Sequence, residues 1–249
     1  MIRYKLTIEY LGTNFCGWQR QKNSYSVQEA VELAAKKLLR ERINLIVAGR
    51  TDAGVHAEGQ VAHFDVHKEF CPRKIQLGIN FHLMNTRFGK DVSIKKAIKV
   101  NKNFNARFSA KKKLYQYMIY NSIHRSPILW EKSWWVRKNL DIKKIIEASQ
   151  YLIGAHDFTS FRARGCQANS PLRTIESIKI SKSNNTILLK FSAKSFLYNQ
   201  VRIMVGTLKD VGSGILDVGD VLKILNSKDR KNAGITAPSK GLTLKRISY

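Results

Sequence analysis

The chain has 249 residues, of which 44 are Lys or Arg and 18 are Asp or Glu, so its formal net charge is +26. An apolar share of 43% and a charged share of 25% are ordinary for a globular protein, which excludes collagen-like, coiled-coil and wholly disordered chains. The length allows one large domain or two of roughly 100 to 150 residues, each able to bury a core.

The positive charge indicates a polyanion partner, most plausibly a nucleic acid, because each phosphate neutralised by Lys or Arg releases counterions and adds affinity. The alternative is a Lys-rich background, since 28 of the 44 basic residues are Lys. Residues 1–108 hold 19 bases and nine acids, and residues 109–249 hold 25 bases and nine acids. The charge is therefore spread over the folded body, which favours a broad docking surface over a disordered arm.

The three cysteines, Cys16, Cys71 and Cys166, are far apart and form no C-x-x-C motif, so the sequence predicts neither a disulfide framework nor a zinc site. The N-terminal residues alternate apolar with charged side chains and do not resemble a signal peptide. No stretch approaches the roughly 20 apolar residues of a membrane span. We expect a soluble, cytoplasmic protein.

The first half of the chain predicts an alternation of strands and helices. Residues 2–10 alternate apolar and polar side chains with a period of two, which is typical of a strand with one buried face. Ser26 and Glu29 form a capping box at the start of a helix that we expect to end near Arg42. The remaining predicted elements are short strands at 43–48 and 60–66, a helix at 73–84 after Pro72, and a strand at 92–100.

The second half of the chain also predicts both strands and helices. Predicted elements are a strand at 114–120, a helix capped by Asp141 that stops at Gly154, extended runs at 173–182 and 186–193, helices near 199–210 and 218–226, and a final strand at 242–249. The two extended runs flank the turn signal Ser183-Asn-Asn185 and predict a hairpin. Together these patterns predict an α+β fold with each sheet covered on one face, and a boundary near residue 108.

The densest group of reactive side chains is the segment Ala48-Gly-Arg-Thr-Asp-Ala-Gly-Val-His56, in a predicted loop between two strands. Its glycines permit unusual backbone angles or a close ligand approach, and Arg50 and Asp52 place opposite charges two residues apart. The same residues also fit an ordinary Asx turn with a solvated ion pair. The pattern by itself leaves both interpretations open.

The string GRTDAGVHA at residues 49–57 resembles the signature of the bacterial tRNA pseudouridine synthase A family. A match of nine consecutive residues is very specific, and the resemblance spans essentially the whole chain. The other segments that match motifs of this family, in order along the chain, are 17–21, 106–110 leading to 114–117, 156–161, 196–206 and 241–242.

This resemblance implies the pseudouridine synthase fold, with two ferredoxin-like α/β halves, a mainly antiparallel sheet and a central cleft. Residues 1–108 would carry the catalytic Asp loop, and residues 109–249 would carry Tyr and Arg side chains of the cleft. The implied activity is a cofactor-free isomerisation of uridine to pseudouridine at positions 38, 39 and 40, on the 3′ side of the anticodon stem-loop of tRNA. Family members work as homodimers.

By the same resemblance, Asp52 is the catalytic carboxylate and Arg202 is the cation that pairs with it. Burial alone would raise the pKa of a carboxyl group, and a nearby guanidinium reverses that shift, so a single catalytic Asp needs such a partner. The family commonly has Met where this chain has Gln200, two residues before Arg202. The difference at Gln200 bears on the packing around the start of this segment more than on the expected pairing of Arg202 with Asp52.

The resemblance also implies roles in substrate binding for Arg50 and Tyr115. A stacked uridine must leave the RNA helix before any carboxylate can reach its ribose. Arg50 resembles the family's base-flipping residue, since a planar guanidinium can stack in place of the lost base. Tyr115 matches the aromatic residue that lies against the flipped uracil, whereas Tyr117 fits better as an ordinary strand residue.

Other features do not favour a site. His63 and His67 are spaced like metal ligands, but no Cys or acidic cluster completes a set, so no metal is expected. Gly212-Ser-Gly214 does not form a nucleotide-binding motif. Two alternative functions stay open from the residues alone: a non-catalytic RNA-binding protein with the same basic surface, and a uridine methyltransferase that uses Cys166.

Overall fold

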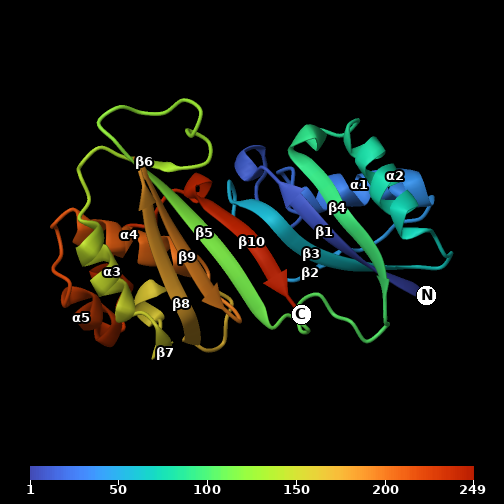
Figure 1. Ribbon diagram of the computed structural model, residues 1–249. Helices are drawn as coiled ribbons and strands as arrows, with labels where there is room; N and C mark the ends of the chain where they lie inside the picture. The colour runs from blue at the N-terminus through green and yellow to red at the C-terminus, as the bar shows by residue number, and fades with distance from the viewer. The chain divides into compact units, whose positions relative to one another are not determined.

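A computed structural model describes residues 1–249 (Figure 1). The chain divides into two compact units, Met1–Lys111 with Thr243–Tyr249, and Lys112–Leu242. Each unit combines helices with a mainly antiparallel set of strands, which confirms the predicted α+β class. The domain division at residue 108, with its assignment of functional residues to each half, stays a prediction.

The first unit holds five strands and two α-helices. They are β1 (Ile2–Tyr10), α1 (Val27–Leu39), β2 (Ile46–Val47), β3 (His56–Val66), α2 (Pro72–Leu83), β4 (Val92–Val100) and β10 (Leu242–Ser248, shared with the unit boundary). The strand order is β4-β1-β3-β10, with β2 paired to β3. β1 runs antiparallel to β3 and β4, and β10 runs parallel to β3, with Thr243 opposite His56.

Alternation along β1 determines which face of this sheet is buried. Tyr4, Leu6, Ile8 and Tyr10 are buried, as the period of two predicts, and the intervening side chains point to the other face. α1 and α2 pack together on one side of the strands (Figure 1). Ser26 caps α1 by accepting a hydrogen bond from the backbone N–H of Glu29, which confirms the predicted helix start.

The second unit holds the remaining elements. They are β5 (Lys112–Asn121), β6 (Trp134–Val136), α3 (Ile142–Gln150), β7 (Gly154–Asp157), β8 (Leu172–Ser183), β9 (Thr186–Ala193), α4 (Gln200–Gly212) and α5 (Asp220–Ser227). The strand order is β5-β9-β8-β7, with β6 parallel to β5. β8 and β9 form the predicted hairpin, and Asn184 adopts the left-handed conformation in its turn. α3 packs on α4.

Several boundaries differ from the sequence predictions. β3 starts at His56 rather than at residue 60, and the predicted strand at 43–48 is reduced to the two residues of β2. The helix expected to run from Asp141 to Gly154 ends at Gln150. Residues 151–153 form a turn, and Gly154, with a φ of +111°, opens the short strand β7. β6 and β7 are too short to show an alternating pattern, so neither was predicted. No helix has the length and apolar character needed to cross a membrane.

Candidate active site

Asp52 lies in the loop between β2 and β3 of the first unit. The loop closes with a turn in which the backbone N–H of Val55 donates to the carbonyl oxygen of Asp52 at 3.1 Å, and Gly54 takes a φ of +77°. Thr51 is buried, Asp52 is half-buried and Arg50 is exposed. The segment is therefore a turn, as its residues suggest, and it carries a half-buried carboxylate two residues after an exposed guanidinium.

Two side chains of neighbouring strands, Tyr10 and Gln60, hold this loop. The phenol oxygen of Tyr10, at the end of β1, lies 2.7 Å from Oγ1 of Thr51. Nε2 of Gln60, on β3, donates to the carbonyl oxygen of Gly49 at 2.9 Å and to the Tyr10 phenol at 3.3 Å. Tyr10, Thr51 and Gln60 are buried, where an unpaired polar atom is costly, so the bonds fix the loop on both sides of Arg50.

Backbone contacts from the 17–21 motif hold the other side of the loop. The N–H of Trp18 donates to the carbonyl oxygen of Thr51 at 3.1 Å. Gly17 has a φ of +104°, and a Cβ atom placed there would lie 2.5 Å from that same carbonyl oxygen. Gly17 is thus required by both its backbone angle and this close approach, which explains a glycine at this point of the motif.

The surroundings of Tyr10 raise the pKa of its phenol. Burial raises the pKa of Tyr10 to about 12, while its hydrogen bonds with Thr51 and Gln60 lower it and the charge of Asp52 adds to the rise. The phenol is consequently neutral at physiological pH and serves as a fixed hydrogen-bonding group. Tyr10 and Gln60 were not predicted as site residues from the sequence.

Arg202 lies at the start of α4 in the second unit. Its Nε donates to the carbonyl oxygen of Ala237 at 2.7 Å, and its Nη1 donates to Oδ1 of Asn199 at 2.8 Å. The backbone N–H of Ala237 in turn donates to the carbonyl oxygen of Arg202. These bonds hold the half-buried guanidinium in one orientation, which a solvated surface arginine would not have.

Tyr115 and Tyr117 lie two residues apart on β5 and so share one face of the strand. Tyr115 is buried and packs edge-on against Phe196, with 5.3 Å between ring centroids. The hydroxyl of Tyr117 donates to the carbonyl oxygen of Pro238 at 2.7 Å. Nε of Arg202 bonds to the carbonyl oxygen of the preceding residue, Ala237. Burial raises the pKa of Tyr117, and the charge of Arg202 lowers it.

Gln200, which stands where the family commonly has Met, is fully buried at the first position of α4. Its Oε1 accepts a hydrogen bond of 2.8 Å from the backbone N–H of Leu197, and its Nε2 has no hydrogen-bond partner. Gln200 therefore holds the turn that leads into α4, one residue after Asn199 and two before Arg202.

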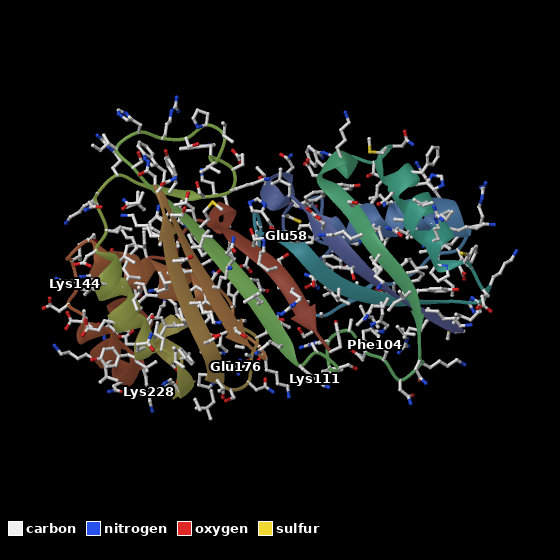
Figure 2. All side chains as sticks on the ribbon, viewed as in Figure 1. Glu58, Phe104, Lys111, Lys144, Glu176 and Lys228 are labelled. Atoms are coloured by element: carbon white, nitrogen blue, oxygen red, sulfur yellow. The ribbon has the colours of Figure 1, made fainter.

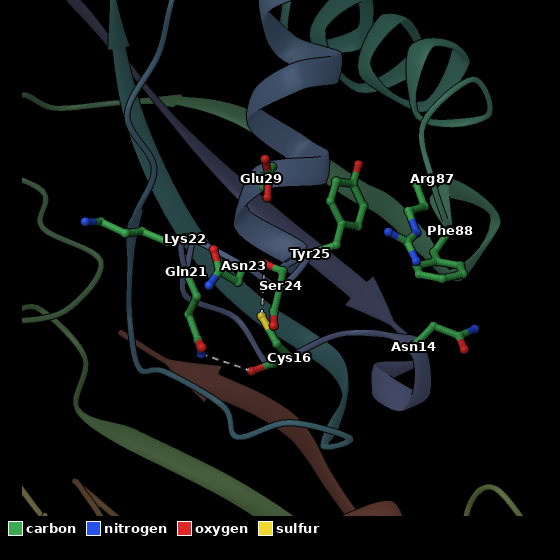
Figure 3. Close-up of a pocket in the computed structure, with 10 residues that line it drawn as sticks. All are labelled: Asn14, Cys16, Gln21, Lys22, Asn23, Ser24, Tyr25, Glu29, Arg87 and Phe88. Atoms are coloured by element: carbon green, nitrogen blue, oxygen red, sulfur yellow. Dashed lines mark hydrogen bonds between the residues drawn. The ribbon is translucent and has the colours of Figure 1, made fainter.

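An open groove with a volume of about 490 Å³ lies on the first unit, where it is lined in part by Cys16, just before the 17–21 motif, and by Gln21, at the end of that motif (Figure 3). Figure 3 shows Gln21 and Ser24 hydrogen-bonded to Cys16. The residues that line the groove are Asn14, Cys16, Gln21, Lys22, Asn23, Ser24, Tyr25, Glu29, Arg87 and Phe88. None of the predicted site residues is among them, so the groove does not include Asp52.

The two histidines with metal-like spacing do not share a site. His63 is buried, and its Nδ1 accepts a hydrogen bond from the backbone N–H of Ala106 at 3.1 Å. The exposed His67 pairs with Glu41 at 2.9 Å. No group of three or more His, Cys, Asp or Glu side chains is placed to hold a metal ion. All three cysteines are free thiols.

Comparison with known proteins decides the family. A family model described as tRNA pseudouridine synthase matches residues 6–109 and 148–249. The chain belongs to the tRNA pseudouridine synthase family. Among curated relatives, the tRNA pseudouridine synthase A of Ehrlichia canis (strain Jake) is 47% identical over 249 residues, which cover 100% of both chains. That of Brucella ovis is 44% identical over 251 residues, which cover 100% of this chain and 98% of the relative.

The family assigned from the string GRTDAGVHA is thus confirmed, and with it the pseudouridine synthase fold and an isomerase activity. The assignment sets aside both alternatives, the non-catalytic RNA-binding protein and the methyltransferase that uses Cys166. Asp52 and Arg50 lie in the first unit of this synthase, and Tyr115 and Arg202 lie in the second. The roles of these four residues, and the pairing of Asp52 with Arg202, stay predictions.

Proposed function

We propose that this synthase converts uridine to pseudouridine on the 3′ side of the anticodon stem-loop of tRNA, at positions 38, 39 and 40, and that Asp52 is its catalytic carboxylate. The observation that carries the proposal is the fixed loop of Asp52. Tyr10, Gln60 and the backbone N–H of Trp18 hold Thr51 and Gly49 on either side of Arg50, within the string that identified the family. A catalytic group gains most when its position is set before the substrate arrives.

The reaction breaks the bond between N1 of uracil and C1′ of ribose, turns the base over, and rejoins it through C5. Atoms and electrons balance without a redox partner, and one ionised carboxylate is a sufficient nucleophile or base. Asp52 must then stay ionised in a site that excludes water. By this proposal the guanidinium of Arg202, held by Asn199 and Ala237, would supply the positive charge that keeps the pKa of that carboxyl low.

Base flipping would fall to Arg50. Its side chain is exposed and comes from a loop whose flanking residues, Gly49 and Thr51, are held by hydrogen bonds. A planar guanidinium on such a support can stack in the gap that the extruded uridine leaves, and can also contact a phosphate. Tyr115, packed against Phe196, would receive the flipped uracil against its ring.

The wider assembly is part of the same proposal. We place the protein in the cytoplasm, where tRNA is modified, and we expect a homodimer in which one protomer holds the body of a tRNA while the other presents its active site. The net charge of +26 supports tRNA as the partner. Binding should weaken with salt by a logarithmic slope of about −0.7 to −0.9 for each phosphate contacted.

The test is to incubate purified protein with unmodified tRNA, with no added metal or methyl donor, and to map pseudouridine along the RNA. Pseudouridine confined to the 3′ side of the anticodon stem-loop is the expected result. Product only at other positions would overturn the proposed substrate site. Absence of product, with tight tRNA binding retained, would overturn the proposed reaction for this chain.

A further inference from the structure

The segment 101–111, which joins β4 to the start of β5, crosses the face of the first unit's sheet that is turned away from α1 and α2; we call it the strap. Arg3, on that face of β1, donates through Nη1 to the carbonyl oxygens of Lys102 and Phe104 at 2.6 and 2.8 Å. Nζ of Lys5, on the same face, lies 5.3 Å from the ring centroid of Phe104. The first part of the strap is thus fastened to β1.

The second part of the strap is a rigid turn. Asn105 holds it from inside, because its Oδ1 accepts hydrogen bonds from the backbone N–H groups of Arg107 and Phe108 at 2.9 and 3.1 Å. Ala106 is fastened to the sheet at both of its backbone groups. Its N–H donates to Nδ1 of His63 at 3.1 Å, and its carbonyl oxygen accepts from the Tyr249 hydroxyl at 2.9 Å.

This turn presents an aromatic ring and a cation to solvent. Phe108 is 77% exposed, and the guanidinium carbon of Arg107, which is also exposed, lies 5.4 Å from the centroid of its ring. An exposed phenylalanine gains nothing from folding, and here the backbone beneath it is held by several hydrogen bonds. Because the backbone beneath them is already fixed, the ring and the guanidinium can contact another molecule without the cost of ordering the turn.

The charge around the strap indicates what that molecule is. The strap contains three basic side chains, Lys102, Arg107 and Lys111, and no acidic one. Phe104 and Lys111, labelled in Figure 2, mark the middle and the end of the strap. Aromatic rings beside Lys and Arg are the composition with which proteins hold unpaired nucleic acid, because any base can stack on the ring while the cations contact the backbone.

We propose that Arg107 and Phe108 form an RNA contact site in which the phenyl ring stacks on an unpaired base of the tRNA and the guanidinium binds a neighbouring phosphate. The site takes no part in the chemistry at Asp52. It rests on the proposed function for the identity of the RNA, and it adds a contact that the predicted site residues do not include. The 106–110 motif, to which no role was given from the sequence, acquires one here.

Fluorescence anisotropy with two end-labelled RNAs tests the site: a single-stranded oligouridylate and a fully paired duplex of the same length. Phe108→Ala should weaken binding of the oligouridylate by about 5- to 150-fold, the range that about 1–3 kcal/mol of base stacking gives, and change duplex binding by less than about twofold. Phe108→Trp should keep the affinity, because a larger ring stacks as well. Arg107→Ala should reduce the salt slope by about 0.7 to 0.9 for either RNA.

Phe81 offers a matched control, since it is 68% exposed on α2 of the same unit. Phe81→Ala should leave both affinities unchanged. The proposal is overturned if Phe108→Ala leaves oligouridylate binding intact, or weakens both RNAs equally. It is also overturned if light scattering shows that Phe108→Ala changes the oligomeric state, because the ring would then contact protein. These measurements need no turnover, so a failure to find pseudouridine would leave them unaffected.

Discussion

The phenol oxygen of Tyr10 lies 2.7 Å from Oγ1 of Thr51, the residue between Arg50 and Asp52. This bond joins the end of β1 to the loop that carries the proposed catalytic carboxylate. Both groups are inside the unit, and Gln60 donates to the same phenol. The position of Asp52 therefore depends on a strand that contributes no group of its own to the proposed chemistry.

Tyr10→Phe should lower kcat by about tenfold or more while KM for tRNA changes little, because the loop loses an anchor and the carboxylate loses its fixed position. The variant should also lose about 1–3 kcal/mol in the free energy of unfolding, since Thr51 and Gln60 each lose a buried partner. Steady-state kinetics and urea denaturation measure the two effects.

Tyr4→Phe is the matched control for this change. Tyr4 lies on the same strand, is equally buried, and exchanges hydrogen bonds with the backbone of Phe70 at 2.6 and 2.9 Å, away from the Asp52 loop. It should lose similar stability and keep kcat. Equal losses of kcat in the two variants would show that Tyr10 acts only through general stability.

Gly17→Ala should distort the Asp52 loop. The added Cβ would lie 2.5 Å from the carbonyl oxygen of Thr51, on a residue whose φ of +104° already disfavours alanine. We expect at least tenfold lower activity together with a lower unfolding midpoint. Gly214→Ala provides the comparison, because Gly214 has a φ of +69° with open space around it. If both variants lost activity to the same degree, backbone strain alone would explain the result.

Arg50→Ala should separate turnover from binding. Loss of the residue that fills the gap in the RNA stack should lower the single-turnover rate by about 10²-fold, since unstacking a base costs a few kcal/mol. The dissociation constant for tRNA should rise only as much as for Arg42→Ala, another exposed arginine of the same unit. A selective loss of tRNA affinity in Arg50→Ala, with the rate of bound RNA unchanged, would make Arg50 a docking residue instead.

The strap should be sensitive to pH through His63. Burial lowers the pKa of His63, and the charge of Arg3 lowers it further while Asp65 opposes this. The stability that His63 contributes is complete above the ordinary pKa of about 6.5 and is lost as pH falls through the lower value of the folded state. Unfolding free energy should thus fall below pH 6.5, by at most about 1.4 kcal/mol per pH unit from this group.

His63→Asn removes the titrating group and leaves an acceptor near the Ala106 N–H. The variant should show a shallower loss of stability between pH 6.5 and 5 than the wild type in urea titrations. Parallel curves for the two proteins would contradict this assignment. The protection factor of the Ala106 amide, which corrects for the intrinsic exchange rate at each pH, should fall with acidification in the wild type only.

Much of the fold could be predicted because it is encoded locally. The alternation along 2–10, the cap at Ser26 and the turn at Asn184 each depend on residues a few positions apart. The parallel pairing of Thr243 with His56 could not be predicted, because it joins segments far apart in sequence and no local pattern specifies a partner. β6 and β7 were not predicted, because a strand of three or four residues is too short to show an alternation of apolar and polar side chains.

The same contrast holds at the site. Arg50 and Asp52 were found because they lie in one unbroken string, whereas Tyr10 and Gln60 read only as strand residues. Their role depends on the register of β1 against β3, which places Ile8 opposite Gln60 and Tyr10 opposite Ala57. A polar side chain at a buried strand position, such as Gln60, was the one local signal that a buried partner existed.

The most direct test of the account is the single-turnover rate of Asp52→Asn on saturating unmodified tRNA, with Asp91→Asn, a carboxylate on the same unit that pairs with Asn14, as the control. Asp52→Asn should bind tRNA as the wild type does and form pseudouridine at least about 10³-fold more slowly, which is about 4 kcal/mol of transition-state stabilisation. Asp91→Asn should keep the wild-type rate. Pseudouridine formed by Asp52→Asn at the wild-type rate would contradict the account.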